Sequence, residues 1–242
     1  MRKTTILFLL SLGIFSSNCF AAKLVEFSLP TKDGLSTLTG EIDFPDQAQI
    51  APLVIMVPGT GLFDRDVLFG HSGTDRDFVF KDLSKSLNAV GVATLRFDYR
   101  GVHCNSRVNP PRTDCVDNNI RKTVTPENIE DDILQLYSYG SHFSGIDSAK
   151  VGIFAHSEGT LHIARLVGSQ RINPKTITFM GMLAESPIGI IHYQMVDRQV
   201  DMLFAADADH DGILTNQEIQ TACDESHVSQ EICNKLKSPS GS

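Results

Sequence analysis

A serine flanked by small residues occurs in the stretch 154–159, which reads FAHSEG. A serine hydroxyl can attack an acyl carbon when a sharp strand-to-helix turn exposes it, and small residues two positions before and after the serine permit such a turn. The usual pattern is Gly-x-Ser-x-Gly, and here Ala155 replaces the first glycine while Gly159 keeps the second. We therefore expect Ser157 to be a nucleophile on this turn. The alternative is an ordinary turn in which Ser157 caps the following helix.

A glycine-containing loop, Val57–Gly61, follows an earlier apolar run and reads VPGTG. Position 64 is Asp64 rather than a third glycine, and no Gly-Lys-Ser/Thr follows, so neither nucleotide-binding motif applies. The backbone N–H of Thr60 or Gly61, together with that of Glu158, could hold the negative oxygen that develops when an acyl group is attacked. The loop thus predicts an oxyanion hole, with a plain turn as the alternative.

Residues 207–218 read DADHDGILTNQE, which is a complete EF-hand loop pattern. Alternating aspartates, a glycine at the sixth position and a glutamate at the twelfth supply the oxygen ligands and the sharp turn that Ca²⁺ requires. The expected ligands are Asp207, Asp209, Asp211, Ile213 through its carbonyl, Thr215 and Glu218. Leu214 is expected to pack inward and His210 to point outward. A solvated acidic loop is the alternative.

Helical patterns flank the calcium loop, with apolar residues at Val196, Val200, Leu203 and Phe204 before it and at Ile219 and Cys223 after it. A single hand with no partner hand cannot form a paired switch, so we expect it to make a helical cap rigid. Exported modules of this kind bind calcium at roughly 10⁻⁴–10⁻³ M.

The elements that position these residues follow from hydrophobic patterning. Residues 25–29 and 38–44 alternate polar and apolar side chains around Lys32-Asp33-Gly34 and predict a hairpin. Continuous apolar runs at 53–57, 92–97, 151–154 and 176–183 fit strands buried on both faces of a parallel sheet. Helical patterns lie between them at 78–87, from the N-cap Thr125 with Pro126 onward, and at 161–166. This alternation predicts a doubly wound, mostly parallel α/β sheet.

Taken together, these motifs resemble the α/β hydrolases of the serine hydrolase superfamily. The similarity is greatest to secreted bacterial members in which the oxyanion loop runs into an Asp-Arg-Asp segment, here Asp64–Asp66. Phe97–Gly101 matches the family's strand-four motif and His156–Gly159 its elbow. The resemblance covers about residues 24–200. It implies hydrolysis of an ester, thioester or peptide-like bond in a small acyl substrate through Ser157, with Asp66 and Asp98 organising loops.

The chain departs from this family after Leu183, where no further apolar run of the buried type occurs. The family's order is serine, then acid, then histidine, and none of the later histidines follows a strand (His162, His192, His210, His227). Glu185 is an alternative acid position. We therefore expect an α/β hydrolase that lacks its last two strands, is C-terminally truncated and has little activity alone. The competing interpretation is a non-catalytic calcium-binding protein on a degenerate hydrolase scaffold.

The N-terminus has the pattern of a secretory signal, with Arg2 and Lys3, an apolar run at 6–15 and small residues ending at Ala21-Ala22. The alternative is an uncleaved anchor. We expect a periplasmic or extracellular protein with no membrane contact after cleavage. The expected organisation is a signal peptide at 1–21, a partial hydrolase core at 22–187, a helical cap at 188–236 and a disordered tail at 237–242.

Composition is close to that of an ordinary globular domain. The 242 residues are 41% hydrophobic and 21% charged, and the formal net charge is −8, which argues against nucleic acid as a partner. Four cysteines remain after signal cleavage and allow three disulfide connectivities. The pairs Cys104–Cys115 and Cys223–Cys233 are favoured because each is local. Free thiols are the alternative.

Overall fold

The computed structural model describes residues 23–46, 48–59, 61–68, 78–103, 115–182, 184–224 and 233–234. The chain forms two compact units, Met1–Met182 and Leu183–Ser242, and each is described by itself. The division thus falls after Met182, whereas the sequence pattern predicts it after residue 187. The expected signal peptide and tail, together with Cys104 and His227, lie outside the described residues.

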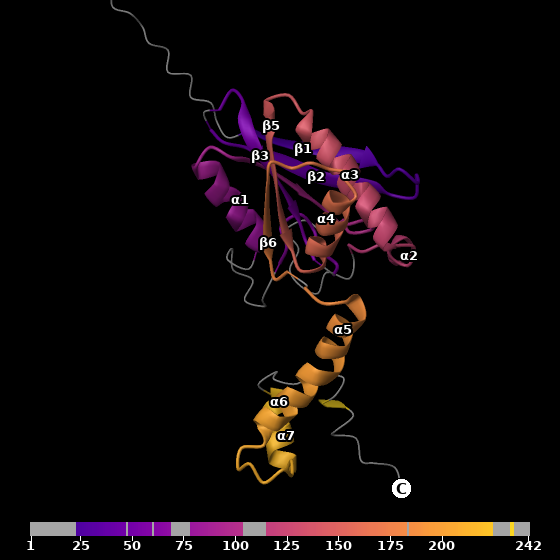
Figure 1. The fold of residues 1–242 in the computed structure, drawn as a ribbon, viewed down its shortest axis with the longest axis vertical. Helices are drawn as coiled ribbons and strands as arrows, with labels where there is room; N and C mark the ends of the chain where they lie inside the picture. Colours follow the sequence, from indigo (N-terminus) through magenta and orange to yellow (C-terminus); the bar gives the residue numbers. More distant parts are fainter. Residues whose placement is uncertain are drawn as a thin grey trace, which may run out of the picture. The chain divides into compact units, whose positions relative to one another are not determined.

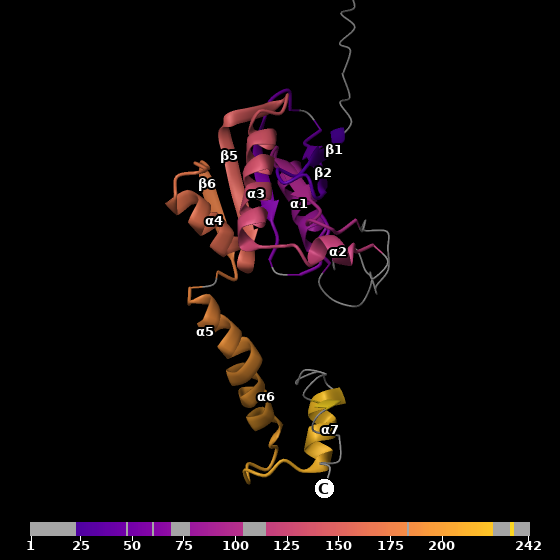
Figure 2. The same cartoon turned by 90° about the vertical axis from the view of Figure 1, so that its right-hand side faces the viewer.

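The first unit is built on a six-stranded mixed sheet in the order β1-β2-β4-β3-β5-β6 (Figures 1 and 2). β1 and β2 form an antiparallel hairpin, β2 is antiparallel to β4, and the remaining neighbours are parallel. The predicted hairpin and the predicted mostly parallel α/β sheet are therefore confirmed. The strands are β1 (Lys23–Pro30), β2 (Thr37–Phe44), β3 (Ala51–Val57), β4 (Ala93–Phe97), β5 (Ile146–His156) and β6 (Thr176–Met180).

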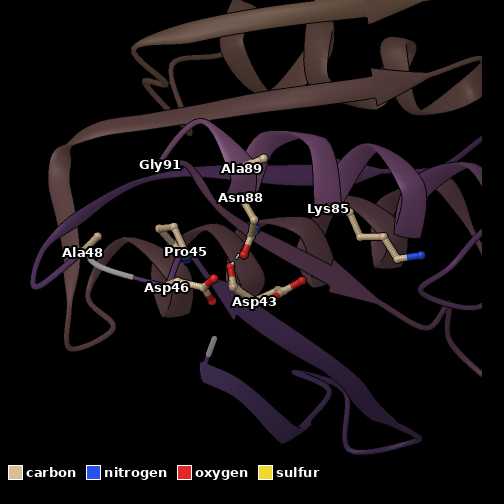
Figure 3. Close-up of a pocket in the computed structure, with 8 residues that line it drawn as sticks. All are labelled: Asp43, Pro45, Asp46, Ala48, Lys85, Asn88, Ala89 and Gly91. Atoms are coloured by element: carbon tan, nitrogen blue, oxygen red, sulfur yellow. Dashed lines mark hydrogen bonds between the residues drawn. The ribbon is translucent and has the colours of Figure 1, made fainter. Parts of the chain in front are cut away.

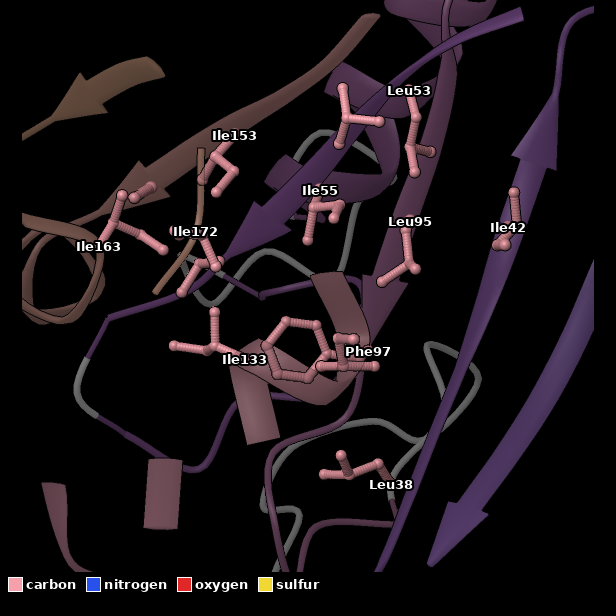
Figure 4. Packing of buried hydrophobic residues seen from close by; sticks show 14 of the residues in the cluster. Leu38, Ile42, Leu53, Ile55, Leu95, Phe97, Ile133, Ile153, Ile163 and Ile172 are labelled. Carbon is pink, nitrogen blue, oxygen red and sulfur yellow. The ribbon is translucent and has the colours of Figure 1, made fainter. Parts of the chain in front are cut away.

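Helices cover both faces of the sheet: α1 (Val79–Ala89) on one, and α3 (Pro126–Ser141) and α4 (Glu158–Gly168) on the other. Because side chains alternate along a strand, Leu53 and Ile55 of β3 join the core beneath α3 and α4, as Figure 4 shows. Met56 instead packs with Phe80 of α1. Burial on both faces explains why these strands are continuous apolar runs in the sequence.

The start of α3 shows how a local signal fixes a helix boundary. Thr125 Oγ1 accepts from the Asn128 N–H (3.3 Å), and Asn128 Oδ1 accepts from the Thr125 N–H (2.9 Å). This reciprocal capping box, with Pro126 in the first turn, satisfies donors that the helix start leaves without intrahelical partners. The predicted N-cap is confirmed. A short helix that no sequence pattern predicts, α2 (Asn118–Arg121), lies just before it.

The apolar run at 176–183 predicts a strand buried on both faces, but β6 is shorter than this run and largely exposed. It ends at Met180 rather than near residue 183, and four of its five side chains are exposed, including those of Ile177 and Met180. Within the described residues β6 pairs only with β5, so it is an edge strand. An apolar run predicts burial only when other elements cover it, and those elements are remote in sequence.

The second unit is helical. It contains α5 (Pro187–His192), the π-helical segment η2 (Tyr193–Asp197), α6 (Arg198–Ala206) and α7 (Asn216–Asp224). Cys233 is fully buried with Ala222, and a disulfide joins Cys223 to Cys233 as predicted. Cys115 of the first unit is also disulfide-bonded. None of the helices in the described ranges has the length and apolarity needed to cross a membrane.

Candidate functional site

Ser157 occupies a strained turn between β5 and α4. Its φ of 52° and ψ of −124° lie outside the regions that non-glycine residues usually adopt. Its side chain makes no capping hydrogen bond to α4, which argues against the alternative that Ser157 is an ordinary helix cap. Strain of this kind persists only where the surroundings hold it. A strained serine between a strand and a helix is the backbone arrangement expected of a nucleophile elbow.

Backbone contacts hold this turn on both sides. The Ser157 N–H donates to the Met180 carbonyl of β6 at 3.0 Å. The Ser157 carbonyl accepts from the Thr160 N–H at 2.9 Å and from Thr160 Oγ1 at 2.6 Å. The strained residue is therefore tied to the neighbouring strand and to the first turn of α4.

The loop after β3 packs directly against the elbow, and two glycines permit this contact. A Cβ on Gly59 would lie 2.6 Å from Ser157 Cβ and 3.2 Å from Ser157 Oγ. A Cβ on Gly159 would lie 2.5 Å from the Pro58 carbonyl oxygen. Any larger residue at either position would separate the loop from the serine. The expected oxyanion loop and the expected nucleophile are thus adjacent.

The backbone of that loop is held by hydrogen bonds to its carbonyl groups. The Tyr99 hydroxyl donates to the Pro58 oxygen at 2.8 Å, and Arg121 donates to the Gly61 oxygen at 3.4 Å. Glu158 is the first residue of α4, where backbone N–H groups lie at the positive end of the helix dipole. The predicted donor Glu158 thus follows Ser157 directly at the start of α4, and Gly61 belongs to the loop whose Gly59 contacts the serine. Thr60, the third predicted donor residue, lies outside the described residues.

Tyr99 and Arg121 are the residues at this site that sequence reasoning missed. Burial raises the pKa of Tyr99, and the negative charge of Glu158 raises it further, so the hydroxyl stays protonated and donates. Burial lowers the pKa of Arg121, while Tyr99 and Glu158 counter this shift. Tyr99 belongs to the strand-four motif and could have been singled out there. Arg121 comes from α2, which carries no motif.

The histidines that the structure describes do not supply an evident base. His162 is buried, and its ring nitrogens lie 3.7 Å from Glu130 Oε1 and 3.9 Å from Glu158 Oε1. His192 faces Asp197 at 3.1 Å in the second unit. Burial lowers the pKa of His156, which keeps its ring neutral at pH 7. Among the described histidines, none hydrogen-bonds to Ser157.

The carboxylates of the family motifs serve structural roles. Asp98 accepts hydrogen bonds from the backbone and side chain of Arg65 and from Thr39 Oγ1, the last at 2.6 Å. Asp66 pairs with buried Arg96. Both acids therefore organise loops, in agreement with the resemblance. Glu185, the alternative acid, accepts from the Ser186 N–H at 2.8 Å and is exposed.

The predicted calcium loop joins α6 to α7 in the second unit. Carboxylate oxygens of Asp207, Asp209 and Asp211 lie within 4.8 Å of one another. Asp207 accepts from the N–H groups of Asp211 at 3.2 Å and of Gly212 at 2.9 Å. Gly212 has a φ of 79°, the left-handed turn expected at the sixth position. The loop backbone thus gathers three carboxylates on one side.

Glu218 closes the loop from the first turn of α7. Its two oxygens accept from the Ala208 N–H at 2.8 Å and from Thr215 Oγ1 at 2.7 Å. The hydrogen bonds from Thr215 lower the pKa of Glu218 and keep it ionised. Ile213 and His210 are exposed, while Leu214 lines a cavity of about 190 Å³ with Val200, Leu203 and Phe204. A donor set made of oxygens alone fits a hard cation such as Ca²⁺.

A larger cavity, of about 640 Å³, lies between β2 and α1 (Figure 3). Asp43, Asp46 and Lys85 line it, and the Asn88 amide donates to the Asp43 backbone oxygen at 3.3 Å. Asp43 pairs with Thr94 at the start of β4, whereas Ser157 follows the end of β5. The cavity therefore lies at the ends of the parallel strands opposite to the ends that Ser157 follows.

Comparison with known proteins adds little beyond the fold. No family model and no curated protein matches the sequence. Similar solved structures include Est1E from Butyrivibrio proteoclasticus (20% identity, TM-score 0.42, 63% of this chain and 49% of that one). A bacterial heroin esterase is also similar, with 14% identity, a TM-score of 0.41, and coverage of 65% of this chain and 44% of that one. The α/β hydrolase GrgF from Penicillium sp. sh18 is similar too, with 18% identity, a TM-score of 0.45, and coverage of 90% of this chain and 68% of that one.

The chain spans about half the length of the first two structures. At these identities and TM-scores the likeness carries no information on activity. The assignment of an α/β-hydrolase type of fold rests on the strand order and on the strained serine after β5.

Proposed function

We propose that the protein is a hydrolase of acyl bonds in which Ser157 is the nucleophile. The observation that carries this proposal is the strained conformation of Ser157, with φ of 52°, against the Gly59 loop. In this arrangement the hydroxyl attacks the carbonyl carbon of a small acyl substrate. The N–H groups of Gly61 and Glu158 stabilise the oxygen that becomes negative.

A serine hydroxyl is a weak nucleophile until a base accepts its proton. Because the described histidines do not hydrogen-bond to Ser157, we expect this chain alone to hydrolyse short esters slowly. Removing members of a catalytic triad leaves only what the oxyanion hole and binding supply. A substitution of Ser157 by alanine should therefore change the basal rate little.

Imidazole in solution can supply a base to Ser157, and this gives the test. The full chain and its Ser157→Ala variant are compared on p-nitrophenyl acetate with increasing imidazole. We expect an increase in rate with imidazole that exceeds the solution reaction in the wild type and is lost in the variant. Equal increases in both proteins would overturn the assignment of Ser157. A high basal rate abolished by Ser157→Ala would uphold Ser157 and contradict the expected absence of a base.

We further propose that the loop 207–218 binds one Ca²⁺. The observation that favours this second function is the gathering of the Asp207, Asp209 and Asp211 oxygens within 4.8 Å, with Glu218 closing the loop. Bringing these carboxylates together without a cation is electrostatically unfavourable, so binding relieves their repulsion. If the serine proves inert, the protein is a calcium-binding module on a hydrolase scaffold.

Calorimetry tests the calcium site directly. Glu218→Gln keeps the side-chain size and removes the bidentate carboxylate, so it should weaken binding strongly. Asp201→Asn is the matched control, because Asp201 is an exposed acid on α6 outside the loop. No calcium heat in the wild type, or equal affinity in Glu218→Gln, would rule the site out.

Export remains our proposal for localisation, with cleavage after Ala21 or Ala22. The Cys223–Cys233 disulfide supports an oxidising compartment. Intact mass of the exported protein, with and without reductant and alkylation, tests both points. Retention of residues 1–21 would contradict the signal peptide, and four free thiols would contradict the disulfides.

A further inference from the structure

The small core of the second unit is built around its disulfide. Cys233 is 0% exposed and Ala222 is 3% exposed. Apolar side chains from both helices pack against this pair: Met202, Leu203 and Ala206 from α6, and Cys223 from α7. The segment at Cys233 therefore contributes a central buried residue where α6 meets α7.

The same two helices hold the ends of the predicted calcium loop. α6 ends at Ala206, and Asp207, the first expected ligand, follows directly. Glu218, the last expected ligand, is the third residue of α7. The Glu218 carboxylate reaches back to the Ala208 N–H at 2.8 Å. Ligand spacing across the loop therefore depends on how α6 packs against α7.

The disulfide lies on α7 close to Glu218, the residue that closes the calcium loop. Cys223 follows Glu218 by five residues, which is about 7.5 Å along a helix. The covalent link to Cys233 thus restrains the helix that carries the closing carboxylate.

We propose that the Cys223–Cys233 disulfide and calcium binding at residues 207–218 are thermodynamically coupled, so that each stabilises the other. This inference rests on the proposed calcium site. With the disulfide closed, α7 is already docked on α6, and calcium binds a loop whose ends are in place. With the disulfide open, binding must also order the Cys233 segment and α7, and the conformational entropy lost lowers the affinity.

The redox step is an exchange with a dithiol reductant such as dithiothreitol. Its thiolate attacks one sulfur of the Cys223–Cys233 bond and forms a mixed disulfide. Its second thiolate then displaces the protein sulfur. The protein gains two electrons and two protons as two thiols, and the reductant leaves as a cyclic disulfide. Because coupling is reciprocal, calcium must oppose this reduction by the same factor by which the disulfide increases calcium affinity.

Calcium titration of the full-length protein is the first arm of the test. We expect Cys223→Ser/Cys233→Ser to bind calcium about tenfold more weakly than the oxidised wild type, within the usual range of coupling between sites. Cys104→Ser/Cys115→Ser is the matched control, since Cys115 lies in the first unit, and its affinity should equal that of the wild type.

The second arm uses the wild-type protein and does not depend on a variant folding. The protein is equilibrated with graded oxidised and reduced dithiothreitol, in saturating calcium or in EGTA. Alkylation and peptide mass spectrometry then report the redox state of Cys223 and of Cys115 separately. We expect calcium to shift the reductant ratio at half-reduction of Cys223 about tenfold. Reduction at Cys115 should not change, and Glu218→Gln should remove the shift.

The outcomes separate this inference from the calcium site itself. Calcium binding of equal strength with the disulfide open or closed, or a reduction midpoint that calcium does not move, would overturn the coupling and leave the site standing. Absence of calcium binding in the oxidised wild type would overturn both. Equal calcium shifts at Cys115 and Cys223 would show a general effect and also refute the proposal.

Discussion

Two glycines in α4 should respond in opposite ways to the same substitution. Gly159 lies in the first turn, and a Cβ there would be 2.5 Å from the Pro58 oxygen and 2.9 Å from the Val57 oxygen. The first distance is about 0.9 Å short of the 3.4 Å at which ordinary contact begins. Both oxygens belong to the backbone at the end of β3, so they cannot rotate away. Gly159→Ala must therefore push α4 from the sheet.

Overpacking of this kind costs about 1–3 kcal/mol, and the higher helix propensity of alanine offsets about 0.5–1 kcal/mol. At the middle of both ranges the net loss is about 1.3 kcal/mol. For a protein of this size that corresponds to a fall in Tm of about 3–5 °C. Gly168 ends the same helix and has no atom within 4 Å of its Cβ position. Gly168→Ala should therefore raise Tm by about 1–4 °C.

Thermal unfolding of the two variants, followed by circular dichroism, measures both effects. Ser157→Ala is a useful reference because it leaves the glycines in place. If Gly159→Ala unfolds at or above the wild-type temperature, the close approach of α4 to β3 is wrong. If Gly168→Ala loses as much stability as Gly159→Ala, the cost arises from glycine replacement in general and not from the contact.

Three further predictions concern stability. Thr125→Ala should lower the free energy of unfolding by about 1 kcal/mol, because it removes the capping box with Asn128. Urea unfolding measures this change, and an unchanged midpoint would contradict the cap. Leu136→Ala, at a fully buried position of α3, should cost about 2–5 kcal/mol in the same assay, and a loss below 1 kcal/mol would contradict its burial. A hydrogen bond from Thr31 lowers the pKa of Asp33 to about 2, so the stability that Asp33 contributes is present above about pH 4 and is lost as the pH falls toward 2. The difference in unfolding free energy between wild type and Asp33→Asn should shrink over that range, by at most about 1 kcal/mol given solvent screening, and a constant difference would refute the shift.

The parts of the fold that could be predicted from sequence are those set by local patterns. The apolar run in β3 predicted a strand covered on both faces. The structure confirms this, since Leu53 and Met56 belong to opposite faces and both are buried. The Thr125-Pro126 pair predicted the start of α3 because capping depends on adjacent residues. The small residues around Ser157 predicted a sharp turn at this position because the turn itself excludes larger side chains.

The features that the sequence could not predict depend on remote contacts. β6 contains the apolar residues Ile177, Phe179 and Met180 beside two threonines, and the exposure of Ile177 and Met180 depends on which elements lie beside them. Arg121 reaches the carbonyl of Gly61 from 60 residues away along the chain. An arginine in a short helix of four residues carries no signal for such a contact.

The hydrogen bond from the Ser157 N–H to the Met180 carbonyl links the strained turn to the edge of the sheet. Amide hydrogen exchange proceeds through local openings, which are least costly where few buried contacts resist them. β6 is such a segment, since it pairs within the described residues only with β5. The amide proton of Ser157 should therefore exchange with solvent as fast as the edge strand frays, and faster than the amide of Ile153 deeper in β5. The lifetime of the strained conformation at Ser157 is thus set by the weakest strand of the sheet.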